Sequence, residues 1–243
     1  MEPTEIALIN ICYMDTHRMP VRLERDGLKD AIVRIRFKTF YNEGYLVEKL
    51  IKNNALINSD EPLIQIPAPT EKNNIPIFLI GNSIYRIQIT SDTISFNFVR
   101  AYPLWINYWS FIKSCLNILG DDIESTFISL QYISCFENES IFDNIDGDIS
   151  LKYLPRFAGS EFSFSCHVHE KEFDATALIR ITDNIKTDPD TTTSVMNISL
   201  QGSVNKTKST FDDYVSFLHK HEKNLFFLLI KEDYIKSLGP HYE

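Results

Sequence analysis

The chain has 243 residues, a formal net charge of −9, and 44% hydrophobic residues that include 17 Phe and 11 Tyr. This apolar content is enough for a packed core and excludes a disordered chain. The negative charge disfavours a nucleic-acid partner, because affinity for DNA or RNA depends on cationic contacts to phosphate. The start of the chain lacks the pattern of a signal peptide, and the longest apolar run, residues 225–230, is far shorter than a membrane span. We therefore expect a cytoplasmic protein with no membrane partner.

The first half of the sequence predicts strands followed by one long helix. Alternating apolar and polar residues predict strands at 31–38, 83–90 and 94–99, and an apolar run predicts an edge strand or packed extension at 6–12. Apolar residues at helical spacing predict a short helix over 44–54 and an aromatic-rich helix over 103–119, which begins at Pro103 and ends at Gly120. Four prolines between 58 and 76 predict an irregular connection there.

The second half repeats this order of elements. A strand is predicted at 126–135, followed by an acidic connector from Glu137 to Asp148. Three more strands are predicted at 161–170, 174–182 and 194–203, with a loop at 183–193 before the last of them. Thr210 or Ser209 can cap the final long helix, which extends to residue 230, and a short helical segment follows at 232–238.

These elements predict an α+β fold in which antiparallel sheets are each covered by a long helix. The recurrence of several strands followed by one helix suggests a duplicated plan, although the halves share no residue-level identity. We predict an N-terminal α+β lobe at 1–136 and a C-terminal α+β lobe at 137–243, and the sequence leaves a single continuous domain open. The four cysteines lie apart in apolar segments, as expected of buried, reduced thiols.

Several stretches resemble a sporadically distributed, largely uncharacterised family of prokaryotic accessory proteins of about this length. The resemblance covers residue 22 to the end, in the strand 31–37, the hairpin 85–97, the helix start Tyr102-Pro103-Leu104-Trp105 and the segment Leu218-His219-Lys220-His221. The family strand that matches 127–134 is more basic, with arginines at the positions of Phe127 and Gln131. The resemblance implies an accessory gene of the kind carried with mobile or defence loci. It implies no catalytic residues.

A basic strand face is the first candidate site. Arg34, Arg36 and Lys38 alternate along one predicted strand, and Arg86 can join them from a neighbouring strand. Such a face can bind an acidic partner or an RNA backbone, and it can equally be an ordinary solvated surface.

A histidine pair is the second candidate site. His167 and His169 project from the same face of a predicted strand, close enough to share a metal ion with further ligands, whereas Cys166 points the other way. A solvent-facing pair is the simpler interpretation, since no ligand spacing supports a metal. The acidic segment 143–148 departs from a calcium loop at Ile145 and predicts a turn. No nucleophile elbow, cysteine-protease context or phosphate loop is present, so we expect no catalytic residue and no cofactor.

We therefore predict a non-enzymatic protein-binding component, acting as a sensor, regulator or immunity partner in a prokaryotic defence or mobile-element cassette. One alternative is a carrier of an apolar small molecule in a cavity beneath the helix 103–119, because aromatic periodicity does not distinguish a filled core from a lined pocket. The other alternative is a metal-dependent enzyme around His167 and His169. The sequence leaves open whether the protein forms a homo-oligomer.

Overall fold

The structure is a computed structural model that describes residues 19–20, 22–25, 27–53, 64–66, 77–98, 102–146, 161–170, 173–188, 190–204 and 210–242. Two compact units are present. The terminal unit comprises Met1–Lys29, Gln131–Gln201 and Thr207–Glu243, and the central unit comprises Asp30–Leu130 and Gly202–Lys206. The two lobes predicted from the sequence, 1–136 and 137–243, stay a prediction.

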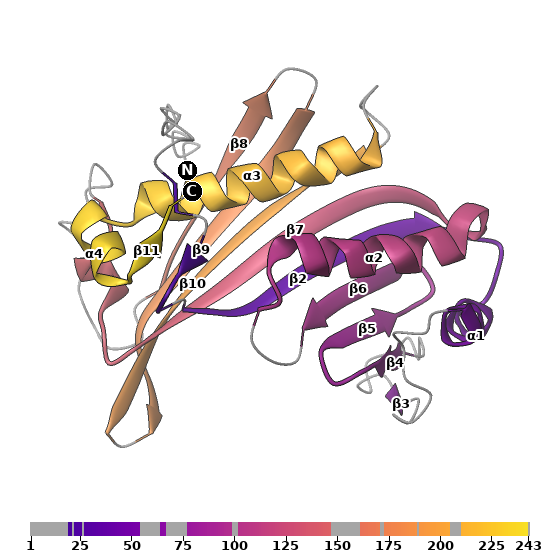
Figure 1. The fold of residues 1–243 in the computed structure, drawn as a ribbon, viewed down its shortest axis with the longest axis horizontal. Coiled ribbons are helices and arrows are strands. Elements are labelled where there is room, and N and C mark those ends of the chain that lie inside the picture. Colours follow the sequence, from indigo (N-terminus) through magenta and orange to yellow (C-terminus); the bar gives the residue numbers. More distant parts are fainter. Residues whose placement is uncertain are drawn as a thin grey trace, which may run out of the picture. The chain divides into compact units, whose positions relative to one another are not determined.

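The central unit contains an antiparallel sheet and two helices (Figure 1). Its strands are hydrogen-bonded in the order β3-β4-β5-β6-β2-β7. The bounds are β2 (Leu28–Lys38), α1 (Glu43–Asn53), β3 (Ile64–Ile66), β4 (Ile77–Gly81), β5 (Tyr85–Ile89), β6 (Thr93–Phe98), α2 (Trp105–Leu119), the 3-10 turn η2 (Gly120–Asp122) and β7 (Glu124–Glu137). The last of these strands continues into the terminal unit.

Aromatic side chains fix α2 on the sheet of the central unit. The Tyr108 hydroxyl donates a 2.9 Å hydrogen bond to the carbonyl oxygen of Ala31 on β2. The Phe111 ring stacks on Tyr85 of β5 at 4.1 Å between centroids and meets Phe96 of β6 edge-on. These rings are buried, so an apolar core forms between α2 and the sheet face that carries the alternating residues of β2, β5 and β6.

The terminal unit contains further antiparallel strands and one long helix (Figure 1). Its strands follow the order β7-β10-β9-β8, and a separate two-stranded pairing joins the ends of the unit. The bounds are β1 (Arg22–Leu23), η3 (Ile141–Asp143), β8 (Glu161–Glu170), β9 (Phe173–Asp188), β10 (Thr191–Ser203), α3 (Phe211–Leu229), α4 (Glu232–Ser237) and β11 (Pro240–His241).

Helix α3 is anchored at its start and along its buried face. Thr210 accepts a hydrogen bond from the backbone N–H of Asp213, whose carboxylate accepts one from the N–H of Thr210, which is a capping box. The Tyr214 hydroxyl donates to the carbonyl oxygen of Asp174 on β9, and the Phe217 ring stacks on Phe173. The predicted cap at Thr210 is therefore confirmed.

The predicted α+β class and the long helix over each sheet are confirmed, while the duplication stays a prediction. Two local predictions are wrong. The connection 58–76 contains the short strand β3, because Ile64–Ile66 pairs with Ile77–Leu79 of β4. The loop 183–193 is mostly strand, because long-range pairing extends β9 to Asp188 and starts β10 at Thr191. The predicted strand at 6–12 lies outside the described residues.

The start of α2 also differs from its prediction. The helix begins at Trp105 rather than Pro103, and Leu104 precedes it with φ +67° and ψ 146°. Gly120 follows the helix with a positive φ of 53°, as expected of a glycine terminator. Among the described residues, none of the helices is long and apolar enough to cross a membrane.

Candidate interaction surface

The outer face of strand β2 carries three cations in a row. Arg34, Arg36 and Lys38 are exposed, while the residues between them are buried beneath α2. Successive outward residues of a strand stand about 6.8 Å apart, so the three charges are evenly spaced along the strand. We call these three residues, together with Arg86 on β5, the basic stripe.

The structure brings Arg86 to the same face as the cations of β2. Arg86 pairs with Asn97 on β6, and β6 lies between β5 and β2 in the strand order. Two strand spacings separate Arg86 from β2, which is about 10 Å. The neighbouring residues Tyr85 and Ile87 are buried toward α2, so Arg86 lies on the opposite, outer face. The four residues therefore lie on the same face of these strands, and their role in binding a partner stays a prediction.

Two cations of the basic stripe contact uncharged side chains on neighbouring strands. The Arg34 Nε donates a 3.3 Å hydrogen bond to Ser95 Oγ on β6. The Arg36 guanidinium lies 5.5 Å from the centre of the Phe127 ring on β7, a cation–π contact. In the part of the chain that the structure describes, neither of these arginines nor Lys38 forms an ion pair with a carboxylate. Within the described ranges, three exposed positive charges therefore have no carboxylate partner.

An exposed aromatic group, which sequence reasoning missed, follows the basic stripe directly. Phe40 is fully exposed, and the rings of Tyr41 and Tyr45 stack with centroids 4.4 Å apart. The Asn42 side chain accepts the backbone N–H of Tyr45 at 2.9 Å and so fixes the start of α1 beside these rings. The available signal was a pair of adjacent aromatics placed in a turn, Phe40-Tyr41, with a capping asparagine after it. We call Phe40, Tyr41 and Tyr45 the aromatic corner.

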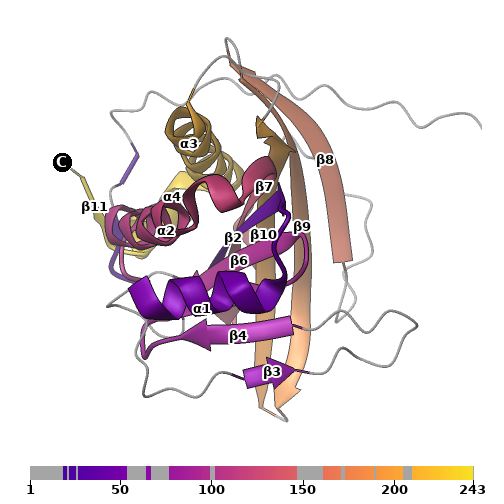
Figure 2. The same ribbon diagram turned by 90° about the vertical axis from the view of Figure 1, so that its right-hand side faces the viewer.

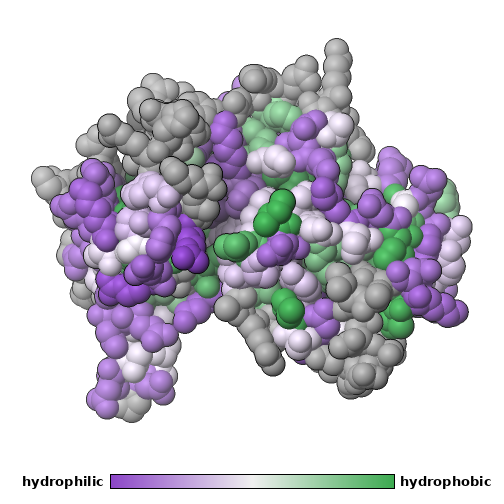
Figure 3. Space-filling view, viewed as in Figure 1, coloured by the Kyte–Doolittle hydropathy of each residue, from purple (hydrophilic) through white to green (hydrophobic). Residues whose placement is uncertain are grey.

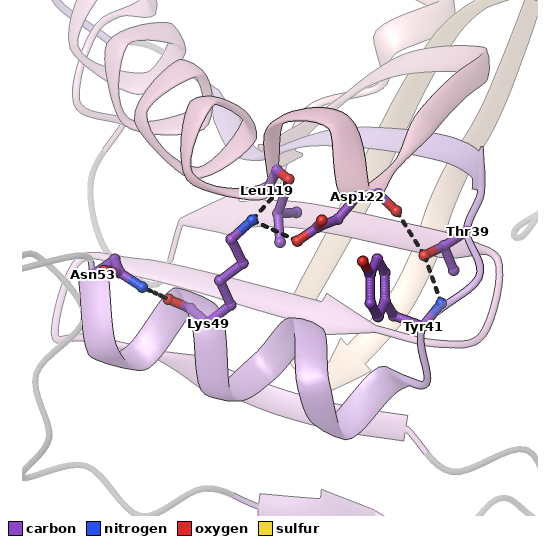
Figure 4. Close-up of polar contacts among 6 residues, drawn as sticks. All are labelled: Thr39, Tyr41, Lys49, Asn53, Leu119 and Asp122. Carbon is purple, nitrogen blue, oxygen red and sulfur yellow. Dashed lines mark hydrogen bonds and ion pairs between the residues drawn. The ribbon is translucent and has the colours of Figure 1, made fainter.

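Lys49 connects helix α1, next to the aromatic corner, with the end of α2 (Figure 4). The Lys49 ammonium donates to the carbonyl oxygen of Leu119 at 3.2 Å and lies 2.5 Å from the Asp122 carboxylate. The Thr39 hydroxyl donates a 2.7 Å hydrogen bond to the carbonyl oxygen of Asp122. The hydrogen bond to Asp122 raises the pKa of Lys49, while burial and the charge of Asp122 raise the pKa of Tyr45. A cation at the carboxyl end of a helix also complements the helix dipole.

A second apolar surface lies at the other end of α2. Leu104 is half exposed in a left-handed backbone conformation, and Ile106 is 72% exposed. A non-glycine residue in this region of φ/ψ space costs about 1–3 kcal/mol. Figure 3 shows apolar side chains gathered over the start of this helix. Beneath them, Trp105 stacks on Trp109 with their rings 5.8 Å apart.

The predicted histidine pair lies on strand β8 of the terminal unit. His167 and His169 are both exposed and stand opposite Thr176 and Asp174 of β9. Within the described ranges, no group of three or more His, Cys, Asp or Glu residues could hold a metal ion. The side chain of Cys166 lies outside what the structure describes. The metal site at His167 and His169 stays a prediction.

Two histidines on α3, the partly buried His219 and the buried His221, make contacts inside the terminal unit. His219 Nδ1 lies 3.0 Å from the Tyr132 hydroxyl on β7, and His221 packs against the Phe217 ring. Burial, and secondarily the charge of Lys223, lowers the pKa of His219 from 6.5 to about 3. This lowered pKa favours the neutral imidazole at physiological pH.

The interior beneath α2 bears on the alternative of a ligand carrier. Tyr108, Phe111 and Ile112 of the helix are buried. The Phe111 ring meets Phe96 of the sheet edge-on, and the Tyr108 ring stacks on Tyr85. These contacts are those of a packed core at these positions. The carrier hypothesis stays a prediction.

Comparison of the sequence with protein-family models and with curated proteins gives no match. The resemblance to prokaryotic accessory proteins accordingly stays an expectation.

Proposed function

We propose that this protein is a non-enzymatic binding module that holds an acidic, extended segment of a protein partner on its basic stripe. The observation that carries the proposal is the row Arg34, Arg36 and Lys38, which lacks carboxylate partners among the described residues of a chain whose net charge is −9. In a cassette of the kind that the resemblance implies, such a module would be the sensor, regulator or immunity partner of a neighbouring gene product.

Spacing supports an extended partner. Outward residues of the stripe repeat about every 6.8 Å, and acidic residues at alternate positions of an extended peptide repeat at the same distance. Each carboxylate can then meet one cation. Two arginines are suited to this contact, because a guanidinium binds a carboxylate through two parallel hydrogen bonds.

Charge and aromatic character support a protein partner rather than a nucleic acid. A polyanion as long as RNA would also approach the rest of the chain, and the net charge of the protein, −9, opposes it. The aromatic corner beside Lys38 adds exposed apolar area of the sort enriched at protein interfaces. A short acidic segment can gain contacts with both surfaces.

The test uses a fluorescent twelve-residue peptide of alternating Glu and Ser, with fluorescence anisotropy as the readout. The triple variant Arg34→Glu, Arg36→Glu, Lys38→Glu should bind about tenfold more weakly, because three exposed charge pairs are worth about 0.2–1 kcal/mol each and the reversed charges also repel the peptide. Binding by the native protein should also weaken as salt rises. A matched control reverses three exposed lysines on other elements, Lys52, Lys186 and Lys236, and should bind within about twofold of the native protein.

Two further probes decide between ligand classes. A peptide of the same composition with all Glu residues in one block should bind more weakly than the alternating peptide, since its charges do not match the stripe. Equal binding by the triple variant would refute the proposal. Tighter binding of single-stranded RNA than of the alternating peptide, lost in the same triple variant, would replace it with a nucleic-acid site.

A further inference from the structure

Strand β8 forms the edge of the sheet in the terminal unit. It pairs with β9 over ten consecutive residues, from Glu161 opposite Thr182 to Glu170 opposite Phe173, without a shift in register. Figure 2 shows β8 beside β9 at the end of the strand order. Within the described residues, β8 pairs with another strand on one side only. The other side presents a row of backbone donors and acceptors.

The sequence and pairing of β8 itself lack the usual protections of an edge strand. Natural edge strands are kept short, bulged, or marked by lysine or proline. The edge strand of the central unit, β3, is three residues long. In contrast, β8 has ten residues, Glu-Phe-Ser-Phe-Ser-Cys-His-Val-His-Glu, with no lysine, no proline and acidic residues only at its ends. Its regular pairing with β9 includes no bulge, whereas β9 and β10 shift register twice.

Two copies of the β8 sequence placed antiparallel, with Ser165 of one copy opposite Ser165 of the other, put residues of matching character opposite each other. We infer that β8 pairs antiparallel with β8 of a second copy of this chain, about a two-fold axis through Ser165. In that register Glu161 stands opposite His169 of the second copy, and Ser163 stands opposite His167 of the second copy. On the other face, Phe162 meets Val168 and Phe164 meets Cys166. An acid then meets a base, and apolar residues meet apolar residues.

Other registers fit less well. A one-residue shift of the pairing places the apolar positions of one strand on the polar face of the other. An axis through Cys166 puts Phe162 opposite Glu170, and an axis through Phe164 shortens the paired segment to residues 161–167. The axis through Ser165 pairs residues 161–169 and keeps both faces matched. The resulting dimer would continue one sheet across two chains.

A cysteine-crosslinking experiment tests the register. Ser165→Cys, made in a Cys166→Ser background, should form a disulfide-linked dimer under mild oxidation, because the two copies of residue 165 stand directly opposite, about 4.5–5.5 Å apart between Cα atoms. The control Ser163→Cys in the same background should not form it. Its two copies would stand about 13 Å apart, beyond disulfide reach. The Cys166→Ser protein alone reports crosslinking through the remaining thiols.

Sedimentation equilibrium tests the dimer itself. The native protein should sediment with the mass of two chains, Ser165→Thr should do the same, and Ser165→Lys should be a monomer, because like charges directly opposite on paired strands repel. Circular dichroism verifies that Ser165→Lys is folded. A monomeric native protein, a Ser165→Lys variant that still dimerises, or equal crosslinking at positions 163 and 165 would each overturn the inference. The outcome is independent of peptide binding at the basic stripe.

Discussion

The imidazole of His219 lies 3.0 Å from the hydroxyl of Tyr132 in the terminal unit, where Tyr132 is buried and His219 is partly buried. Helix α3 and strand β7 are joined by this hydrogen bond. Because burial opposes a charge on the ring, the pKa of His219 falls to about 3 from its ordinary value of 6.5. Protonation of His219 should therefore weaken the packing of α3 against β7.

Stability should fall as the pH drops through the range between these two values. In the unfolded chain His219 binds a proton near pH 6.5, whereas in the folded chain it stays neutral until about pH 3. The unfolded state then holds the extra proton, so stability is complete above 6.5 and declines below it, by at most about 1.4 kcal/mol per pH unit. Urea unfolding at pH 7 and pH 5 measures this decline. His219→Gln should reduce the difference, and the exposed control His167→Gln should not.

Loss of the Lys49 contacts should destabilise the central unit. Lys49→Met removes the hydrogen bond to the carbonyl oxygen of Leu119 and leaves the half-buried Asp122 carboxylate without its cation. We expect a clearly lower urea midpoint. The matched control is Lys52→Met on the same helix. It removes an exposed ion pair with Glu48, and this loss should change the free energy of unfolding only slightly. Equal midpoints for the two variants would contradict a structural role for Lys49.

Asp183 is the buried acid on which the connector after β7 depends. Its carboxylate accepts hydrogen bonds from Ser140 Oγ at 2.8 Å, Ser194 Oγ at 2.7 Å and the backbone N–H of Ile141 at 2.9 Å. Asp183→Ala removes the acceptor of the Ser140 hydroxyl and of the Ile141 N–H, whereas Ser194 keeps the carbonyl oxygen of Glu139 as an acceptor. The loss should cost about 2–3 kcal/mol in chemical denaturation. The exposed control Asp174→Ala should change the free energy of unfolding by less than about 0.5 kcal/mol. A small effect at Asp183 would show that other groups satisfy these donors.

Asn224 offers a substitution that should stabilise the fold. Its side chain is 2% exposed on α3, and among the described residues neither its amide nitrogen nor its amide oxygen has a hydrogen-bond partner. Replacing an unpaired buried amide with an apolar group of similar size, Asn224→Leu, should raise the free energy of unfolding by about 1 kcal/mol. The contrasting variant Asn197→Leu loses a 3.2 Å hydrogen bond from Gln131 and should lower it. Destabilisation by Asn224→Leu would indicate a partner for the amide.

Local patterns were sufficient to place most elements. The alternation in 31–38 and the helical spacing in 103–119 predict β2 and α2 to within three residues. Apolar residues recur every two positions on the buried face of a strand and about every 3.6 positions on that of a helix. The same alternation predicts that Arg34, Arg36 and Lys38 share an outer face. The acids in the first turn of α3 and the hydroxyl of Thr210 likewise predict its cap.

Other features depend on which strands pair, and distant residues decide that. Because β7 is the neighbour of β2, the Phe127 ring lies against the Arg36 guanidinium. Because only β6 lies between β5 and β2, Arg86 lies near the other cations of the stripe. Pairing with β9 and β10 turns residues predicted as loop into strand, since backbone hydrogen bonds outweigh the turn preference of the sequence. The edge position of β8, and the burial that keeps His219 neutral, follow from packing in three dimensions. The sequence by itself thus determined most elements and their buried faces. The tertiary structure decided which charges stay unpaired, because the residues that contact a charged side chain come from distant parts of the sequence.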